Sequence, residues 1–140
     1  MALLNYNRSL LTNLADSTNV ALTGVDTLIL EFGLFVSQAT NFVELQTTIG
    51  WEVVNTLLTL QPTIQLTIRQ DGGIVASANQ ESVPDGEDED LEMVTTFQAV
   101  LTNVPAGHHV YQLFARNTQA AQGDISITGP ANISGKVIVN

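Results

Sequence analysis

LEMVTTFQAVLTNVPAGHHVYQLFARNTQAAQGDISITGPANISGKVIV, residues 91–139, is the stretch that decides the fold of this 140-residue chain. Four of its segments are rich in β-branched and aromatic residues and have strand composition: 91–103, 108–117, 124–128 and 132–139. Turn-forming residues separate these segments: Val104-Pro105-Ala106-Gly107, Gln122-Gly123 and Gly129-Pro130. Short strands divided by regular turns predict an all-β domain, and we expect its last strand to lie inside a sheet.

Two segments upstream extend this pattern. Segment 26–37 is apolar on both faces, which predicts burial on both sides, either as a central strand or as a strand covered by another subunit. Segment 42–54 has apolar residues at its odd positions, with Thr47 the single exception and Trp51 the largest member, and is expected to bury that face. The residues of that face are Val43, Leu45, Thr47, Ile49, Trp51 and Val53.

Segment 63–77 predicts a β-hairpin. Ile64, Leu66 and Ile68 alternate with polar residues, Asp71-Gly72-Gly73 supplies a tight turn, and 74–77 returns. No segment predicts an internal helix longer than two turns, and no repeat of fixed period occurs. The chain therefore reads as a sandwich of roughly eight to ten strands.

Composition restricts the classes of partner. The chain has 4 Lys+Arg against 14 Asp+Glu, a net charge of −10, which disfavours nucleic acid and anionic membrane surfaces. Without cysteine, neither a disulfide framework nor a thiolate metal site is available. Only 13% of the residues are charged, against about 25% in ordinary soluble domains. Uncharged polar surface suits a protein that packs against copies of itself, because burying charge is costly.

Residues 1–17 differ from the rest, and we expect a connector arm there, followed by a single all-β domain at 18–140. Six large apolar residues are too many for a solvated tail and predict docking on a neighbouring subunit: Leu3, Leu4, Tyr6, Leu10, Leu11 and Leu14. The spacing of Leu3, Leu10 and Leu14 also allows a short amphipathic helix. An extended arm is the alternative.

The acidic residues and histidines of the chain do not show the spacing of a known type of metal site. The acidic loop at Asp85 and 87–90 lacks the spacing of a helix–loop–helix calcium site and reads as a solvated loop. His108 and His109 are adjacent, so in a strand they point to opposite faces.

Carboxylate pairs such as Asp26 with Glu31, or Glu44 with Glu52, have nothing that brings them together. There is no Gly-Xaa-Ser-Xaa-Gly stretch around a serine nucleophile. We expect no catalytic residue, no cofactor and no metal, and therefore not an enzyme.

Two runs carry a family resemblance: TNVPAGHHVYQLFARN at 102–117 and GDISITGPANISGKVIV at 123–139. They resemble the C-terminal half of trimeric jelly rolls related to tumour necrosis factor and the complement collagen-head domain. The versions on bacterial endospore surfaces are most similar, including the head domain of the collagen-like exosporium glycoprotein. The resemblance covers residues 20–140 and implies a jelly-roll sandwich of roughly ten antiparallel strands that forms homotrimers.

This chain departs from the exosporium proteins because no Gly-Xaa-Yaa stalk precedes the domain. It is similar in plan to spore appendage fibres, in which the N-terminal connector of one subunit docks on the next, and that family has no catalytic residues. The expectation is a trimeric fibre subunit whose partners are copies of itself and a spore-surface anchoring protein, with neither nucleic acid nor membrane.

The first eight residues lack the cationic head and apolar run of a signal peptide. We therefore expect synthesis in the cytosol and a place on the spore surface, outside the cell, after lysis of the mother cell. The alternatives are a trimeric receptor- or glycan-binding tip domain and a viral capsid-type jelly roll.

Overall fold

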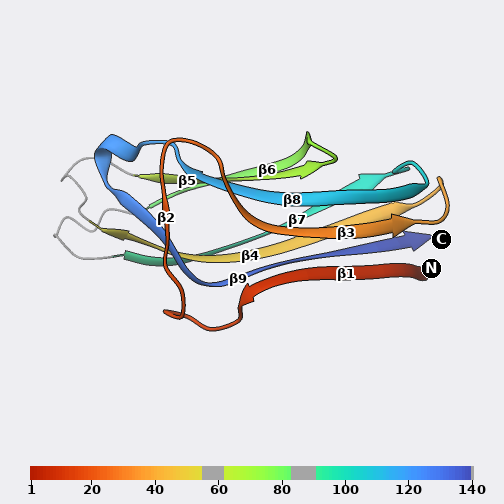
Figure 1. Ribbon diagram of the computed structural model, residues 1–140, viewed down its shortest axis with the longest axis horizontal. Coiled ribbons are helices and arrows are strands. Elements are labelled where there is room, and N and C mark those ends of the chain that lie inside the picture. Colours follow the sequence, from red (N-terminus) through yellow and green to blue (C-terminus); the bar gives the residue numbers. More distant parts are fainter. Residues whose placement is uncertain (55–61, 83–90, 140) are drawn as a thin grey trace.

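A computed structural model describes residues 1–54, 62–82 and 91–139. These residues form nine strands and one short 3₁₀ helix, η1 (Ala120–Gln122). The strands make two antiparallel sheets packed face to face (Figure 1). The predicted all-β sandwich is thus confirmed, and the described residues contain no α-helix of the length and hydrophobicity that a membrane crossing requires.

The first sheet has the order β1-β9-β4-β7, and the short strand β2 also pairs with β9. Its strands are β1 (Ala2–Thr12), β2 (Val20–Leu22), β4 (Phe42–Val54), β7 (Leu91–Thr102) and β9 (Asp124–Val139). The second sheet has the order β3-β8-β5-β6. Its strands are β3 (Thr27–Val36), β5 (Thr63–Gln70), β6 (Gly73–Glu81) and β8 (Gly107–Asn117). The chain crosses repeatedly between the sheets, which is the connectivity of a jelly roll.

The core lies between the sheets and is built from alternate residues of each strand. In β4 the predicted inward face is confirmed, because Val43, Leu45, Ile49 and Val53 are fully buried and Trp51 is nearly so. The indole Nε1 of Trp51 donates a hydrogen bond of 2.8 Å to the buried hydroxyl of Thr95 on β7. The largest aromatic side chain of the core therefore keeps a hydrogen-bond partner.

Only one face of β3 is buried within the single chain. Leu30, Phe32 and Leu34 point into the sandwich, where the ring of Phe32 stacks on Tyr111 with centroids 5.5 Å apart. On the opposite face Leu28 is 46% and Phe35 54% exposed. The central-strand alternative for this apolar segment is wrong, because β3 is the outermost strand of the second sheet. Cover of its outer face by another subunit stays a prediction.

The expected turn at Gly129-Pro130 is wrong, since β9 continues through it as one strand of 16 residues. Gly129 has a φ of 103°, in the region that favours glycine, and the pairing of β9 with β4 shifts register between Ile49 and Trp51. A Cβ built on Gly50 of β4 would lie 2.0 Å from the carbonyl oxygen of Gly129. Gly50 lets the two backbones meet closely, and Gly129 adopts the positive φ with which β9 continues as one strand.

Gly50→Ala should therefore destabilise the fold strongly, by about 3 kcal/mol or more, because the added methyl group meets rigid backbone. Urea unfolding followed by tryptophan fluorescence measures the free energy of unfolding. Gly73→Ala is the matched control, since its nearest contact would be an ordinary 3.6 Å. Equal stabilities of the two variants would contradict the packing of β9 on β4 described above.

Candidate functional site

Residues 2–12 form β1, an edge strand paired antiparallel with β9 of the same chain. The register runs from Ala2 opposite Val139 to Thr12 opposite Ala131, with the two chain ends close together (Figure 1). The helical alternative for this segment is wrong, because the free edge of β9 offers the backbone a complete set of strand partners. The expected arm is, in the single chain, the outermost strand of the first sheet.

The side chains of β1 are arranged in the reverse of the usual order. Its apolar residues point to solvent: Leu3 is 61%, Tyr6 42% and Leu10 51% exposed. Each lies directly opposite an outward-facing residue of β9, namely Ile138, Lys136 and Asn132. A half-buried strand ordinarily places its apolar side chains toward the core. The outer face of β1 is thus an apolar surface with no cover in the single chain.

The inward face of β1 is polar and reaches the free edge of the second sheet. The side-chain amide of Asn5 donates a 3.0 Å hydrogen bond to the carbonyl oxygen of Phe35, and that of Asn7 donates one of 2.7 Å to Gly33. β1 is therefore held mainly by backbone pairing and two side-chain amide hydrogen bonds, and Leu4 is the β1 residue that packs against the core. None of its residues is buried.

Of the six residues predicted to dock, five are exposed, and these five are Leu3, Tyr6, Leu10, Leu11 and Leu14. Leu4 is the exception, because a register shift between Leu3 and Asn5 turns it toward the core, where it packs. Sequence spacing gives no sign of this bulge. Contact between these five exposed residues and a second subunit stays a prediction.

The loop after β1, residues 13–19, crosses β9 at Thr128 and Gly129. The backbone amides of Ser17 and Thr18 both donate to the carbonyl oxygen of Thr128, at 3.0 and 3.3 Å. A Cβ on Gly129 would lie 2.3 Å from the carbonyl oxygen of Leu14. Asp16 adopts a φ of 53° in this loop. These contacts hold the loop against β9 at the point where β1 ends.

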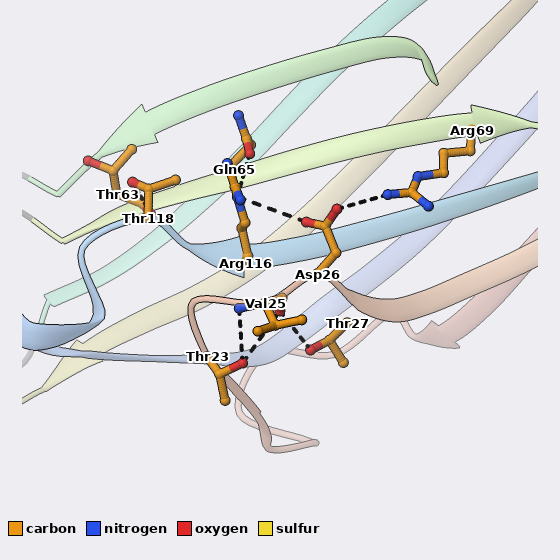
Figure 2. A network of polar contacts seen from close by, with 9 residues as sticks. All are labelled: Thr23, Val25, Asp26, Thr27, Thr63, Gln65, Arg69, Arg116 and Thr118. Carbon is orange, nitrogen blue, oxygen red and sulfur yellow. Dashed lines mark hydrogen bonds and ion pairs between the residues drawn. The ribbon is translucent and has the colours of Figure 1, made fainter. Parts of the chain in front are cut away.

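Two of the four Lys and Arg side chains converge on one carboxylate outside β1. Asp26, in the connection from β2 to β3, lies 3.1 Å from Arg69 and 4.0 Å from Arg116 (Figure 2). Arg69 also stacks on the ring of Phe114, 4.4 Å from its centroid. This cluster ties the crossover between the sheets to β5 and β8, which is a structural role.

The carboxylate pairs considered from sequence do not form acid–base centres. Asp26 binds Arg69, and Glu31 instead accepts a 3.3 Å hydrogen bond from Gln112. Glu44 and Glu52 lie on the same face of β4, eight residues and roughly 26 Å apart.

No group of three or more acidic or histidine residues in the described ranges can hold a metal ion. The acidic loop Asp85 to Asp90 lies outside those ranges.

His109 joins two turns at one end of the sandwich. Its Nδ1 lies 2.6 Å from Asp71 Oδ2, and its Nε2 lies 2.6 Å from the carbonyl oxygen of Pro105. Both partners are acceptors, so both contacts are satisfied only when the ring carries two N–H donors and is charged. Burial alone would lower the pKa of His109, but the bonds to Asp71 and Pro105 raise it above its ordinary value.

The partner carboxylate is bound from two sides. The backbone amide of Val110 donates to Asp71 Oδ1 at 2.8 Å, and this bond, followed by that from His109, lowers the pKa of Asp71. His108 is exposed and points away. The two adjacent histidines thus do not share a ligand, as their opposite orientation predicts.

Comparison with known proteins adds little. No protein-family model matches the chain, and no curated protein matches it. Among solved structures, the insecticidal delta-endotoxin Cry8Ea1 from Bacillus thuringiensis is similar over 86% of this chain, at 12% identity and a TM-score of 0.47. The chain spans 20% of the length of that toxin, and a similarity of this size carries no argument about function.

The His109 contacts predict a pH-dependent stability. A raised folded-state pKa stabilises the protein fully below the unfolded pKa of about 6.5, and this stabilisation is lost as the pH rises through the folded value. Urea unfolding of the unaltered chain and of His109→Gln should give free energies that converge from pH 6 to 8. His108→Gln is the control and should keep the full pH dependence. Parallel curves for the unaltered chain and His109→Gln would contradict the charged imidazole.

Proposed function

We propose that this chain is a structural, self-assembling subunit in which the β1 segment links copies head-to-tail into a fibre. The observation that carries the proposal is the reversed side-chain pattern of β1, with Leu3, Tyr6 and Leu10 facing solvent. The apolar side chains of β1 are exposed to solvent in the single chain. Covering them with a neighbouring copy removes apolar surface from water and therefore stabilises the assembly.

The link is an exchange of strand partner. β1 pairs with β9 through nine registered residue pairs, and the same pairs form if β1 lies on β9 of a neighbouring copy. The exchange therefore changes few contacts, and the loop 13–19 provides the length of chain that opens. Because the strand leaves one subunit and enters the next, the contact is heterologous and propagates as a filament.

The family resemblance of residues 102–117 and 123–139 supplies the remaining parts of the proposal. From that resemblance we propose three copies around one axis and a fibre on the surface of an endospore, released when the mother cell lyses. Its partners are then copies of itself and an anchoring protein of the spore surface.

A glycan- or receptor-binding tip is the second candidate, and one surface feature favours it. A hollow of about 370 Å³ lies at the end of the sandwich, lined without charge by residues that can stack on or hydrogen-bond an uncharged sugar. The residues are Gln38, Thr40, Asn41, Phe42, Thr102, Asn103 and Val139. This reading predicts discrete particles that do not elongate.

A disulfide across the ends of β1 and β9 tests the strand exchange. Ala2 lies opposite Val139, and the chain has no cysteine of its own, so Ala2→Cys with Val139→Cys introduces one defined pair. Oxidised as a single chain, the variant should stay as short particles in negative-stain micrographs. After reduction the same variant should form filaments. The reduced protein therefore serves as the control for the oxidised protein.

Filaments grown under reducing conditions and then oxidised should give a ladder of covalent multimers on a non-reducing gel, because each disulfide would join two chains. Covalent monomers from such filaments would show that β1 stays on its own subunit. Filaments from the oxidised single chain would show the same. Either result overturns the exchange.

A further inference from the structure

The outer face of the first sheet carries charge of opposite sign at its two ends. Near the chain termini, Arg8 and Lys136 point outward beside Glu44, which lies directly opposite Lys136 in the register. Toward the other end, Glu52 of β4 lies directly opposite Glu92 of β7. Arg8 and Lys136 are called the basic end below, and Glu52 with Glu92 the acidic end.

The acidic end has a third member in the loop after β1. The charge of Asp16, then a hydrogen bond with it, and finally the charge of Glu52 raise the pKa of Glu92. Like charges directly opposite on neighbouring strands destabilise a sheet, and here nothing basic in the described residues stands between them. A cationic surface placed against this end would remove that repulsion.

The basic end is the only basic region that the described residues leave available. The other two cations, Arg69 and Arg116, are committed to Asp26 on the second sheet. For a chain of net charge −10, two copies repel each other over most approaches. The outer face of the first sheet is where their charges match.

Between the two ends the outward side chains are uncharged. Two of them are large and apolar, Leu10 and Val94, and are 51% and 58% exposed. The others are polar: Gln46, Thr48, Thr96, Gln98, Asn132 and Ser134. Tyr6 and Val100 lie beside the Lys136–Glu44 pair, and Leu3 and Phe42 lie beyond it toward the chain termini. An uncharged centre between charged ends suits a protein interface.

We propose that this face seats a second copy of the chain, with its strands antiparallel to those of the first. The basic end of each copy then lies against the acidic end of the other, roughly 26 Å along the strands. Parallel packing would instead set Glu52 and Glu92 of one copy against the same two carboxylates of the other. The contact is isologous, so one set of complementary charges is used twice.

The inference rests on self-association but not on strand exchange, because the same residues line the face whichever chain supplies β1. It is a two-fold contact, and it therefore differs from the threefold cluster that the family resemblance implies. The mass of the assembly separates the two. The disulfide ladder of the Ala2 and Val139 variant shows whether strand exchange fails. Charge reversal and disulfide trapping on the outer face show whether this contact fails.

Charge reversal at either end tests the contact by analytical ultracentrifugation of the full chain. Arg8→Glu with Lys136→Glu makes both ends acidic, and Glu52→Lys with Glu92→Lys makes both ends basic. Each variant alone should dimerise about tenfold more weakly or worse, since it sets like charges together. An equimolar mixture should recover a dimer containing one chain of each kind, and added salt should weaken it.

Glu31→Lys with Glu81→Lys on the second sheet is the control, because it changes net charge as much as the Glu52 and Glu92 reversal without touching the face. It should dimerise at least as well as the unaltered chain. A mixture that stays dissociated overturns the contact. So does a trimer of the unaltered chain that neither reversal disturbs.

Disulfide trapping fixes the direction of the strands. Gln46→Cys lies beside the basic end and Ser126→Cys beside the acidic end, opposite Glu52. A mixture of the two single-cysteine chains should give mainly the mixed disulfide under mild oxidation. Predominant homodimers of each chain would show parallel packing and overturn the antiparallel arrangement, even if the charge-reversal mixture associates.

Discussion

The pairing of β9 is the interaction on which the rest of the structure depends. This strand of 16 residues pairs with β4 along one edge and with β1 and β2 along the other, so it holds most of the first sheet together. It can do so because two glycines leave room around it: a side chain on Gly50 would collide with the β9 backbone, and one on Gly129 would collide with the loop after β1. The close approach at Gly129 positions this loop, whose amides bind Thr128, and thereby sets where β1 begins its run along the edge.

The attachment of β1 differs in kind from that of the other strands. Backbone pairing with β9 and the amides of Asn5 and Asn7 hold it, whereas the inner strands are held by buried apolar side chains. Edge strands with little buried apolar area open at a small cost in free energy compared with global unfolding. A subunit that exchanges its first strand requires this division, because the sandwich must remain folded while β1 changes partner.

The four Lys and Arg side chains fall into two groups, one that binds within the domain and one on the outer face of the first sheet. Arg69 and Arg116 surround Asp26 and close the crossover from one sheet to the other. Arg8 and Lys136 instead stand on the open face of the first sheet, on β1 and β9, and the acidic residues Glu52 and Glu92 lie farther along that face on β4 and β7. In a strongly acidic chain the position of a few cations decides where two copies can meet, since elsewhere their long-range repulsion opposes contact.

Much of the sandwich follows from sequence alone. Segment 42–54 coincides with β4 and buries the side chains its alternation predicts, because a period of two must place one set of residues on one face. The hairpin at Asp71-Gly72-Gly73 is equally local, since its turn residues specify it. The outward direction of Leu3, Tyr6 and Leu10 is not local: it follows from the register of β1 on β9, whose partner residues stand more than a hundred positions away. The alignment of charges across β1, β9, β4 and β7 likewise exists only once the strands are paired, because a strand's own sequence fixes which of its residues share a face but not what lies beside them.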